Sequence, residues 1–196
     1  ADQMGWRNRY DTSMNRDTLT RHPLWPRLQF AIALARECGE LAIQESRNLK
    51  ISSKGAHDVL TQADLAVERH IRAKVATSFP GDLVVGEEMG GQSGMEESAD
   101  FWLVDPIDGT ANYAADIPRW CVSIGYLKAG KPALGVLFDP VLDRMYAAAR
   151  GAGAWLNGNS IRARSRKSLD GATIELGWST RRSGRKIWTT PARGSS

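Results

Sequence analysis

Residues 121–149 read CVSIGYLKAGKPALGVLFDPVLDRMYAAA and contain three runs rich in apolar side chains. Two short turn signals separate the runs, Gly-Lys-Pro at residues 130–132 and Pro-Val-Leu-Asp at residues 140–143. Turns this short can join only antiparallel neighbours. The stretch therefore predicts an antiparallel meander of three strands.

Two helices are expected before this meander. In residues 27–46, apolar side chains recur on one helical face, at positions 28, 31, 34, 35, 38, 41 and 42. The second helix is expected over residues 62–79, because Thr61 followed by Asp64 is a helix-capping pattern and Pro80 ends the helix. Its buried stripe is expected at Leu65, Val67, Ile71 and Val75. Residues 47–60 are expected to form a polar loop.

Further strands are expected at residues 82–88, 100–106 and 172–178, with a hairpin around Asn157-Gly158. Together these elements predict an α+β fold, a layered αβ sandwich. Two long helices should pack on one face of a largely antiparallel sheet that contains residues 82–87, 101–105 and 121–149.

The composition indicates a water-soluble chain with an ordinary core, since 42% of the 196 residues are hydrophobic and 24% are charged. The longest apolar run in a helical pattern, FAIALA at residues 30–35, is too short to span a membrane. No signal-peptide pattern is present at the start of the sequence. We therefore expect a cytoplasmic location, no membrane partner, and two buried free thiols at Cys38 and Cys121.

Charge is distributed unevenly along the chain. From Arg150 onward there are 10 Lys and Arg against 2 Asp and Glu, whereas the preceding part has 16 against 20. A basic segment can bind nucleic acid, but it can also be a set of solvated loops. Aromatic residues are not interleaved with these charges, and no helix that could read a groove accompanies them. The solvated-loop interpretation is favoured, and no nucleic-acid partner is expected.

The stretch LVDPIDGTANY, residues 103–113, carries Asp105 and Asp108 on either side of a proline. Pro106 cannot donate a hydrogen bond to a neighbouring strand, so the strand is expected to end there and to leave the carbonyl of Ile107 available. Two carboxylates and a carbonyl are hard oxygen ligands, which suit Mg²⁺, Mn²⁺ or Ca²⁺. This stretch is therefore a candidate metal site.

Neighbouring residues strengthen the hypothesis. The amides of Gly109 and Thr110, at an expected helix start, would favour an anion. Another apolar strand, VVGEE at residues 84–88, ends on Glu87 and Glu88. Separately, these motifs could be an ordinary Asp-Gly turn and a solvated strand end. However, two like charges about 4 Å apart repel by roughly 4 kcal/mol at intermediate dielectric, which favours a compensating cation.

These motifs resemble those of the inositol monophosphatase family of metal-dependent phosphomonoesterases. The similarity covers roughly residues 25–182. Besides VVGEE and DPIDGTANY, the similar segments are KGAHDVLTQAD (54–64), IPRWCVSIGY (117–126), PVLDRMYAAARGAGAWLNG (140–158) and ATIELGWSTRR (172–182).

The resemblance implies a two-metal Mg²⁺ site. Glu87, Asp105 and the carbonyl of Ile107 match the ligands of the first ion. Asp105 also matches a bridge to a second ion, which Asp108 helps to hold while also contacting substrate. The implied activity is hydrolysis of a small phosphorylated substrate, most closely inositol monophosphate, with Glu87 orienting the attacking water.

The remaining implied roles surround this site. Gly109 and Thr110 match residues whose amides bind the phosphate. Thr110 and Asp64 match a hydrogen-bonded pair that helps to activate the water, although Asp64 by itself could simply cap a helix. Lys54 matches a lysine on a flexible loop, and Glu88 matches an acid behind the metal ligands.

One departure from the family pattern concerns the second half of its fold. The family continues into a second αβ half with a Trp-Asp-x-Ala-Ala-Gly-like motif, which supplies the last ligand of the second ion, and this motif is not found here. We therefore expect a truncated chain whose unpartnered surface could form a homodimer. The expected organisation is a disordered lead (1–22), a metal-binding αβ domain (23–165), the start of the second half (166–182) and a tail unlike the family (183–196).

Three alternatives to an inositol-phosphate phosphatase stay open at this point. The first is a phosphatase of another branch, acting on histidinol phosphate or a nucleotide bisphosphate. The second is a catalytically impaired relative that serves as a binding or dimerisation module. The third, less favoured, is a basic nucleic-acid binder.

Overall fold

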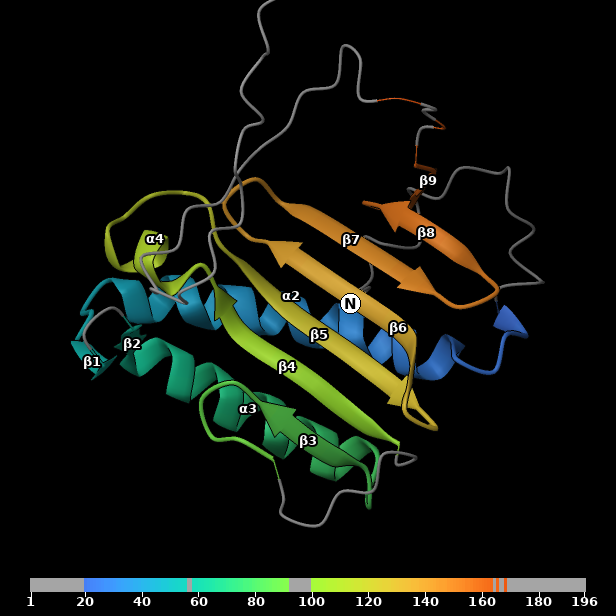
Figure 1. Cartoon of the computed structure of the whole chain (residues 1–196), viewed down its shortest axis with the longest axis horizontal. Coiled ribbons are helices and arrows are strands. Elements are labelled where there is room, and N and C mark those ends of the chain that lie inside the picture. The colour runs from blue at the N-terminus through green and yellow to red at the C-terminus, as the bar shows by residue number, and fades with distance from the viewer. Residues whose placement is uncertain (1–19, 56–57, 92–99, 164, 166–167, 169–196) are drawn as a thin grey trace, which may run out of the picture.

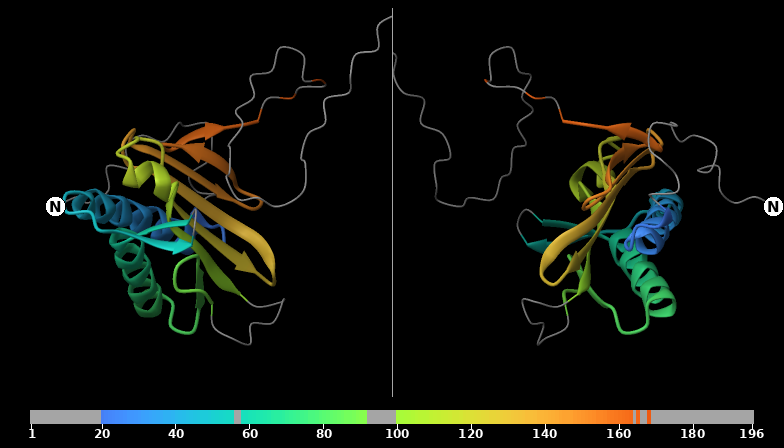
Figure 2. Two further views of the ribbon diagram at one scale, coloured as in Figure 1. Left: turned by 60° about the vertical axis from the view of Figure 1, so that its left-hand side comes forward. Right: turned by 90° about the vertical axis from the view of Figure 1, so that its right-hand side faces the viewer.

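The structure, a computed structural model, describes residues 20–55, 58–91 and 100–163, together with residues 165 and 168. In this part, two long helices, α2 and α3, pack on one face of a seven-stranded sheet (Figure 1; Figure 2). A short helix, α4, and a separate two-stranded hairpin lie at one end of the sheet (Figure 1). The predicted α+β architecture, with both helices on one face, is confirmed.

Helix α2 spans Trp25–Ser46 and begins two residues before the expected start, with Pro26 in its first turn. Proline is favoured at this position because the first amides of a helix have no intrahelical acceptor. The predicted apolar face is confirmed, and its buried residues are Leu28, Ala31, Ile32, Leu34, Ala35, Cys38, Gly39 and Ala42. Gly39 allows the helix to approach the sheet closely, since a Cβ there would lie 2.7 Å from the Phe138 ring.

Helix α3 spans Gln62–Ser78 and begins with the predicted capping box. The Thr61 hydroxyl accepts a hydrogen bond from the Asp64 amide, and the Asp64 carboxylate accepts one from the Thr61 amide. Val67, Ile71 and Val75 are buried as expected, whereas Leu65 is only half-buried. Two acids, Asp64 and Glu68, are also fully buried on the inward side of this helix.

The expected polar loop before α3 is wrong in part, because strand β1 (Ile51–Gly55) pairs with strand β2 (Asp58–Thr61). The pairing is antiparallel and joins Ile51 to Thr61 and Ser52 to Leu60. Only a few residues in each strand are apolar, so the hairpin has little of the alternating pattern that marks a half-buried strand. The lysine that was expected on a flexible loop, Lys54, has its backbone in β1.

The large sheet follows the order of the chain from β3 to β9. Its strands are β3 (Leu83–Gly86), β4 (Phe101–Asp108), β5 (Cys121–Lys128), β6 (Lys131–Asp139), β7 (Arg144–Ala149), β8 (Gly153–Leu156) and β9 (Asn159–Ile161). The β3–β4 pair is parallel and all other neighbours are antiparallel. The predicted meander and the hairpin at Asn157-Gly158 are therefore confirmed.

Strand β4 continues two residues past the predicted end at Pro106. Its pairing with β5 is regular up to Asp105 and shifts register before Asp108. Pro106 lies inside this irregularity, where no ladder hydrogen bond is required from it, so the proline does not stop the strand. The shift follows directly after the first of the two candidate aspartates.

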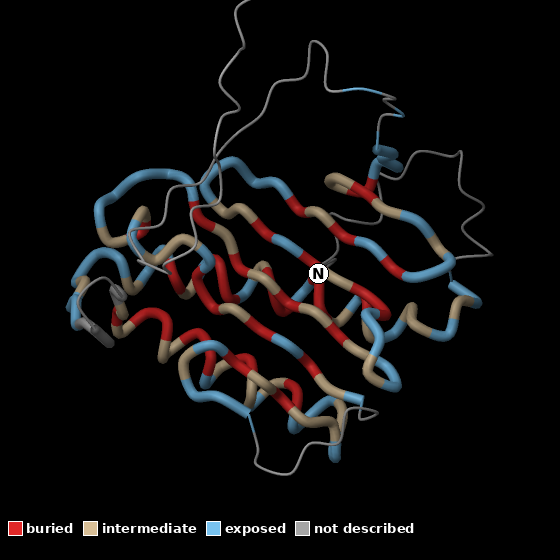
Figure 3. The backbone as a smooth tube through the Cα atoms, viewed as in Figure 1, coloured by how far each residue is buried: buried red, intermediate tan, exposed pale blue. Residues whose placement is uncertain are grey.

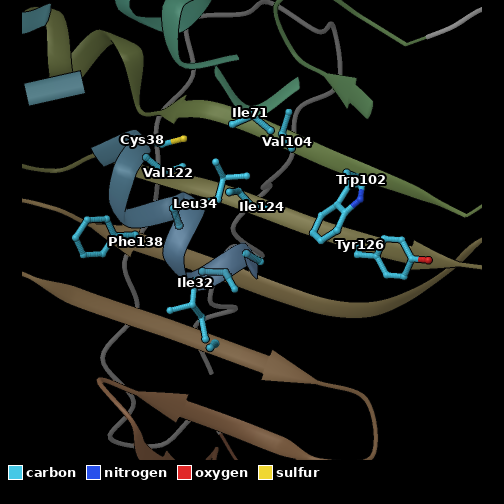
Figure 4. Close-up of a cluster of buried hydrophobic side chains, with 14 of the residues drawn as sticks. Ile32, Leu34, Cys38, Ile71, Trp102, Val104, Val122, Ile124, Tyr126 and Phe138 are labelled. Carbon is cyan, nitrogen blue, oxygen red and sulfur yellow. The ribbon is translucent and has the colours of Figure 1, made fainter. Parts of the chain in front are cut away.

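The core lies between the two helices and the sheet (Figure 3). Ile32, Leu34 and Cys38 of α2 meet side chains of the central strands, which include Val122 and Ile124 (Figure 4). Nearer to β3, the rings of Trp102 and Tyr126 pack with centroids 5.0 Å apart (Figure 4). The two predicted thiols are free; Cys38 is buried and Cys121 is half-buried.

Among the described residues, no helix is both long and apolar enough to cross a membrane. The strand predicted at residues 172–178 and the tail predicted at residues 183–196 lie outside the described residues. The predicted domain boundaries and the cytoplasmic location stay predictions.

Candidate active site

The two acidic strand ends predicted from the sequence lie side by side. Strands β3 and β4 are parallel, and Gly86 is paired to Val104. The next residue in each chain segment, Glu87 after Gly86 and Asp105 after Val104, therefore lies at the same edge of the sheet. The amide of Glu87 donates a hydrogen bond of 3.2 Å to the carbonyl of Val104. The backbone thus places the Glu87 carboxylate beside that of Asp105.

Asp105 is partly buried beside two other carboxylates. Burial, a hydrogen bond with the Glu87 carboxyl group, and the nearby charge of Asp108 together raise the pKa of Asp105 to about 7. No ion pair among the described residues includes Glu87, Asp105 or Asp108. Three carboxylates therefore share one edge of the sheet with no compensating side-chain cation in the described part of the chain.

The turn after Asp108 requires glycine. Gly109 has a φ of 102°, and a Cβ at this position would lie 2.9 Å from the carbonyl oxygen of Arg119. The chain then enters helix α4, Thr110–Ala114. Among the hydrogen bonds of the described residues, none is donated by the amide of Gly109 or of Thr110.

Thr110 connects the DPIDGT turn to helix α3. Its hydroxyl oxygen lies 3.3 Å from Oδ1 of Asp64 and 3.0 Å from the carbonyl oxygen of Ile107. Asp64 uses its other oxygen, Oδ2, to accept hydrogen bonds from the amide of Thr61 at 2.8 Å and from the hydroxyl of Thr61 at 2.5 Å. The two interpretations of Asp64 are thus compatible, since one oxygen caps the helix and the other faces Thr110.

The two remaining sequence-predicted residues are Lys54 and Glu88. The Lys54 side chain lies outside the described residues. Glu88 is half-buried, and its amide donates a hydrogen bond of 2.9 Å to Oε2 of Glu68.

Sequence reasoning missed two residues near this edge. The thiol of Cys121 lies 3.8 Å from Oδ2 of Asp108. Burial and the charge of Asp108 raise the pKa of Cys121 to about 12, so this thiol stays protonated at neutral pH. The other residue is Glu68, whose only signal in the sequence is its spacing of four residues from both Asp64 and Arg72.

The donor atoms at this edge fit a hard divalent cation. Carboxylates and a backbone carbonyl are the ligands that Mg²⁺ prefers, and clustered carboxylates with a raised pKa are stabilised by a cation. Within residues 20–55, 58–91 and 100–163, no group of three or more His, Cys, Asp and Glu side chains encloses a metal position. Glu87 and Asp105 would hold the ion together with the carbonyl of Ile107, which leaves further positions for water or substrate.

Comparison with known proteins identifies the family. The sequence profile of the Inositol monophosphatase family matches residues 24–190 of the chain. The chain belongs to the inositol monophosphatase family. The predicted family resemblance is thereby confirmed, and the match extends beyond the segment of residues 25–182 that carries the quoted motifs.

Individual members of the inositol monophosphatase family show the same similarity. Nus factor SuhB of Pseudomonas aeruginosa is 38% identical over 157 residues, which cover 78% of this chain and 58% of that protein. The inositol-1-monophosphatase of Rhizobium meliloti is 38% identical, over 74% of this chain and 52% of that protein. The solved structure of the IMPase of Thermotoga maritima aligns with a TM-score of 0.68 at 32% identity, over 74% of this chain and 56% of that one. The chain thus spans a little more than half the length of these relatives.

Proposed function

We propose that the chain is part of a Mg²⁺-dependent phosphomonoesterase whose substrate class is an inositol monophosphate. The observation that carries this proposal is the meeting of Glu87 and Asp105 at one sheet edge, where the pKa of Asp105 is raised to about 7. A cluster of carboxylates in which one pKa is raised this far is typical of a cation site. Family membership supports phosphate-ester chemistry at that site.

Glu87, Asp105 and the carbonyl of Ile107 would hold the first ion, and Asp105 with Asp108 would contribute to a second. When bound, Mg²⁺ lowers the pKa of a water molecule and offsets the negative charge of the phosphate and of the leaving oxygen. Glu87, which is exposed at the sheet edge, can in addition accept a hydrogen bond from the attacking water. This hydrogen bond would hold the water in one orientation.

The pair of Thr110 and Asp64 would act as the general base of the reaction. If the Thr110 hydroxyl donates its proton to Oδ1 of Asp64, at 3.3 Å, its oxygen lone pairs are directed away and can accept a hydrogen bond from water. The contacts of Thr61 with the other oxygen of Asp64 fix this carboxylate in place. The pair can therefore orient the water and assist its deprotonation.

The amides of Gly109 and Thr110 would receive the phosphate. They follow Asp108 in the turn, and no acceptor for them is found among the described residues. Asp108 at the same turn would bind both substrate and the second ion. The family resemblance supports this assignment.

The activity of residues 1–196 by themselves is expected to be low. Asp105 and Asp108 are the carboxylates that these residues offer to the second ion, and the motif for its last ligand is not found in this sequence. Loss of one group that stabilises the transition state typically lowers the rate by about 10²–10³-fold.

The test is an assay of phosphate release from inositol monophosphate by residues 1–196, with and without Mg²⁺. Slow release that requires Mg²⁺ and that is removed by Thr110→Val is expected. Thr77→Val, which changes an exposed threonine of α3, is the matched control and should leave the rate unchanged. Release that persists in Thr110→Val would contradict the proposal. Histidinol phosphate and a nucleotide bisphosphate, assayed in parallel, test the substrate class.

A binding role without catalysis is the second candidate. The name of the Pseudomonas aeruginosa relative, Nus factor, favours it, and so the expected absence of a nucleic-acid partner stays a prediction. Mg²⁺ binding without phosphate release from any of the three substrates would favour this candidate.

A further inference from the structure

The turn that carries Glu87 is held by a buried ion pair of helix α3. We define the Glu87 turn as residues 86–90. Oε2 of Glu68 accepts a hydrogen bond of 2.9 Å from the amide of Glu88, and both oxygens of Glu68 lie 3.2 Å from the amide of Met89. These two amides directly follow the candidate metal ligand.

Arg72 completes the arrangement from the next turn of α3. Its Nε and Nη2 donate to Oε1 of Glu68 at 2.9 and 2.6 Å. The same guanidinium donates to the carbonyls of Val84, at 3.0 Å, and Gly90, at 2.5 Å. Glu68 and Arg72 therefore form hydrogen bonds to the backbone on both sides of Glu87, at Val84 before it and at residues 88–90 after it.

The contact is too close for any side chain at residue 86. A Cβ on Gly86 would lie 2.2 Å from the carboxyl carbon of Glu68. The Glu68 side chain is completely buried and that of Arg72 is 24% exposed. A charged pair at this depth costs desolvation energy, which its hydrogen bonds to the turn must offset.

We infer that Glu68 and Arg72 are positioning residues, which hold the Glu87 turn in the geometry that lets the Glu87 carboxylate meet Asp105. This inference rests on the proposed function only in its consequence for Mg²⁺. Two backbone hydrogen bonds also hold the turn: the Gly86 amide donates to the carbonyl of Gly90 at 3.1 Å, and the Glu87 amide donates to that of Val104 at 3.2 Å. Without the ion pair, these backbone bonds would have to locate the ligand.

The first test measures the turn itself in the absence of metal. Amide hydrogen exchange of the peptide covering residues 84–91 should be slow in the parent chain and at least about tenfold faster in Glu68→Gln, because the new amide NH₂ group cannot accept from the Glu88 and Met89 amides. Glu37→Gln, which removes the exposed ion pairs of Glu37 with Lys74 and His70 of the same helix α3, is the matched control and should leave this peptide unchanged. Equal exchange in the parent and in Glu68→Gln would overturn the inference.

The second test separates positioning from the simple effect of charge. Calorimetric titration with Mg²⁺ should show an affinity about 10–100-fold weaker in Glu68→Gln, as is typical when a partner that orients a metal ligand is removed. Arg72→Gln is decisive. Removing a cation near the site would strengthen Mg²⁺ binding if only charge mattered, whereas release of the turn weakens it. Tighter or unchanged binding in Arg72→Gln would contradict the positioning role.

The two tests distinguish failure of the inference from failure of the proposed function. If the parent chain does not bind Mg²⁺, the proposed function is contradicted. If residues 84–91 of that chain nevertheless exchange slowly and Glu68→Gln accelerates their exchange, the positioning role of Glu68 and Arg72 is supported. A Glu68→Gln variant that does not fold can be replaced by Arg72→Gln in the exchange experiment. Faster exchange confined to residues 84–91 supports the inference, and faster exchange throughout the chain contradicts it.

Discussion

Single side chains at the sheet edge combine structural and chemical roles. Asp64 caps helix α3 with one oxygen and contacts Thr110 with the other. The motif DPIDGT and the capping pattern at Thr61 both predicted such residues, because turns and caps restrict which residue types are allowed. Glu68 could not be predicted in this way, since no local rule marks a carboxylate that will be buried by partners distant in sequence.

The raised pKa of Asp105 predicts a pH dependence of stability in the metal-free chain. The ordinary pKa of an aspartate is about 4, and that of Asp105 in the folded chain is about 7. The folded chain therefore holds an extra proton between these values. Its contribution to stability is complete below about pH 4 and is lost as the pH rises through 7. Denaturant unfolding should show this decline in the parent chain and not in Asp105→Asn.

The same proton competes with Mg²⁺. Because the ion binds the ionised carboxylate, the dissociation constant for Mg²⁺ should rise by up to about tenfold for each pH unit below 7. Calorimetric titrations at pH 6 and pH 8 measure this dependence. Equal affinity at the two values would contradict protonation of the cluster.

At the scale of whole elements, strong periodicity made prediction possible. The meander of β5, β6 and β7 and the inward face of α2 follow from alternation and helical spacing that extend over many residues. The hairpin of β1 and β2 has too few apolar residues for such a signal. The end of β4 was also misjudged, because the rule that proline ends a strand does not apply within an irregular pairing.

The connection between β4 and α4 should be sensitive to a single methyl group. Gly109→Ala is expected to lower the free energy of unfolding by about 1–3 kcal/mol, because a φ of 102° strains alanine and its Cβ would crowd the Arg119 carbonyl. The matched control is Gly135→Ala in β6, where a Cβ would meet no atom within 4 Å. Denaturant unfolding of both variants measures the difference, and similar stabilities would contradict the described turn.

At the scale of the whole molecule, helices α2 and α3 cover one face of the large sheet, and no helix among the described residues covers the other. Burial alternates along β4 and β6, and on the opposite face Leu103 and Leu137 are 49% and 43% exposed. Apolar side chains in such positions favour association with another surface. The sequence predicted the helical layer, but an antiparallel meander alone does not show what covers its second face.

Residues 1–196 expressed by themselves should therefore self-associate. Sedimentation velocity should show a species larger than the monomer whose fraction increases with protein concentration, and Leu103→Ser combined with Leu137→Ser should reduce it. Leu142→Ser, at an exposed residue of the β6–β7 turn, is the control and should leave association unchanged. A monomer at all concentrations, or equal effects of the two sets of variants, would contradict this prediction.

The central claim is that the edge formed by Glu87, Asp105 and Ile107 binds Mg²⁺, and calorimetric titration of Asp105→Asn tests it most directly. Asparagine keeps the size of the side chain and removes the negative charge of the carboxylate that is proposed to contact both ions. The parent chain is expected to bind Mg²⁺ measurably at pH 8 and Asp105→Asn is expected not to bind it, with both proteins folded by circular dichroism. Mg²⁺ binding by Asp105→Asn with the affinity of the parent would contradict it.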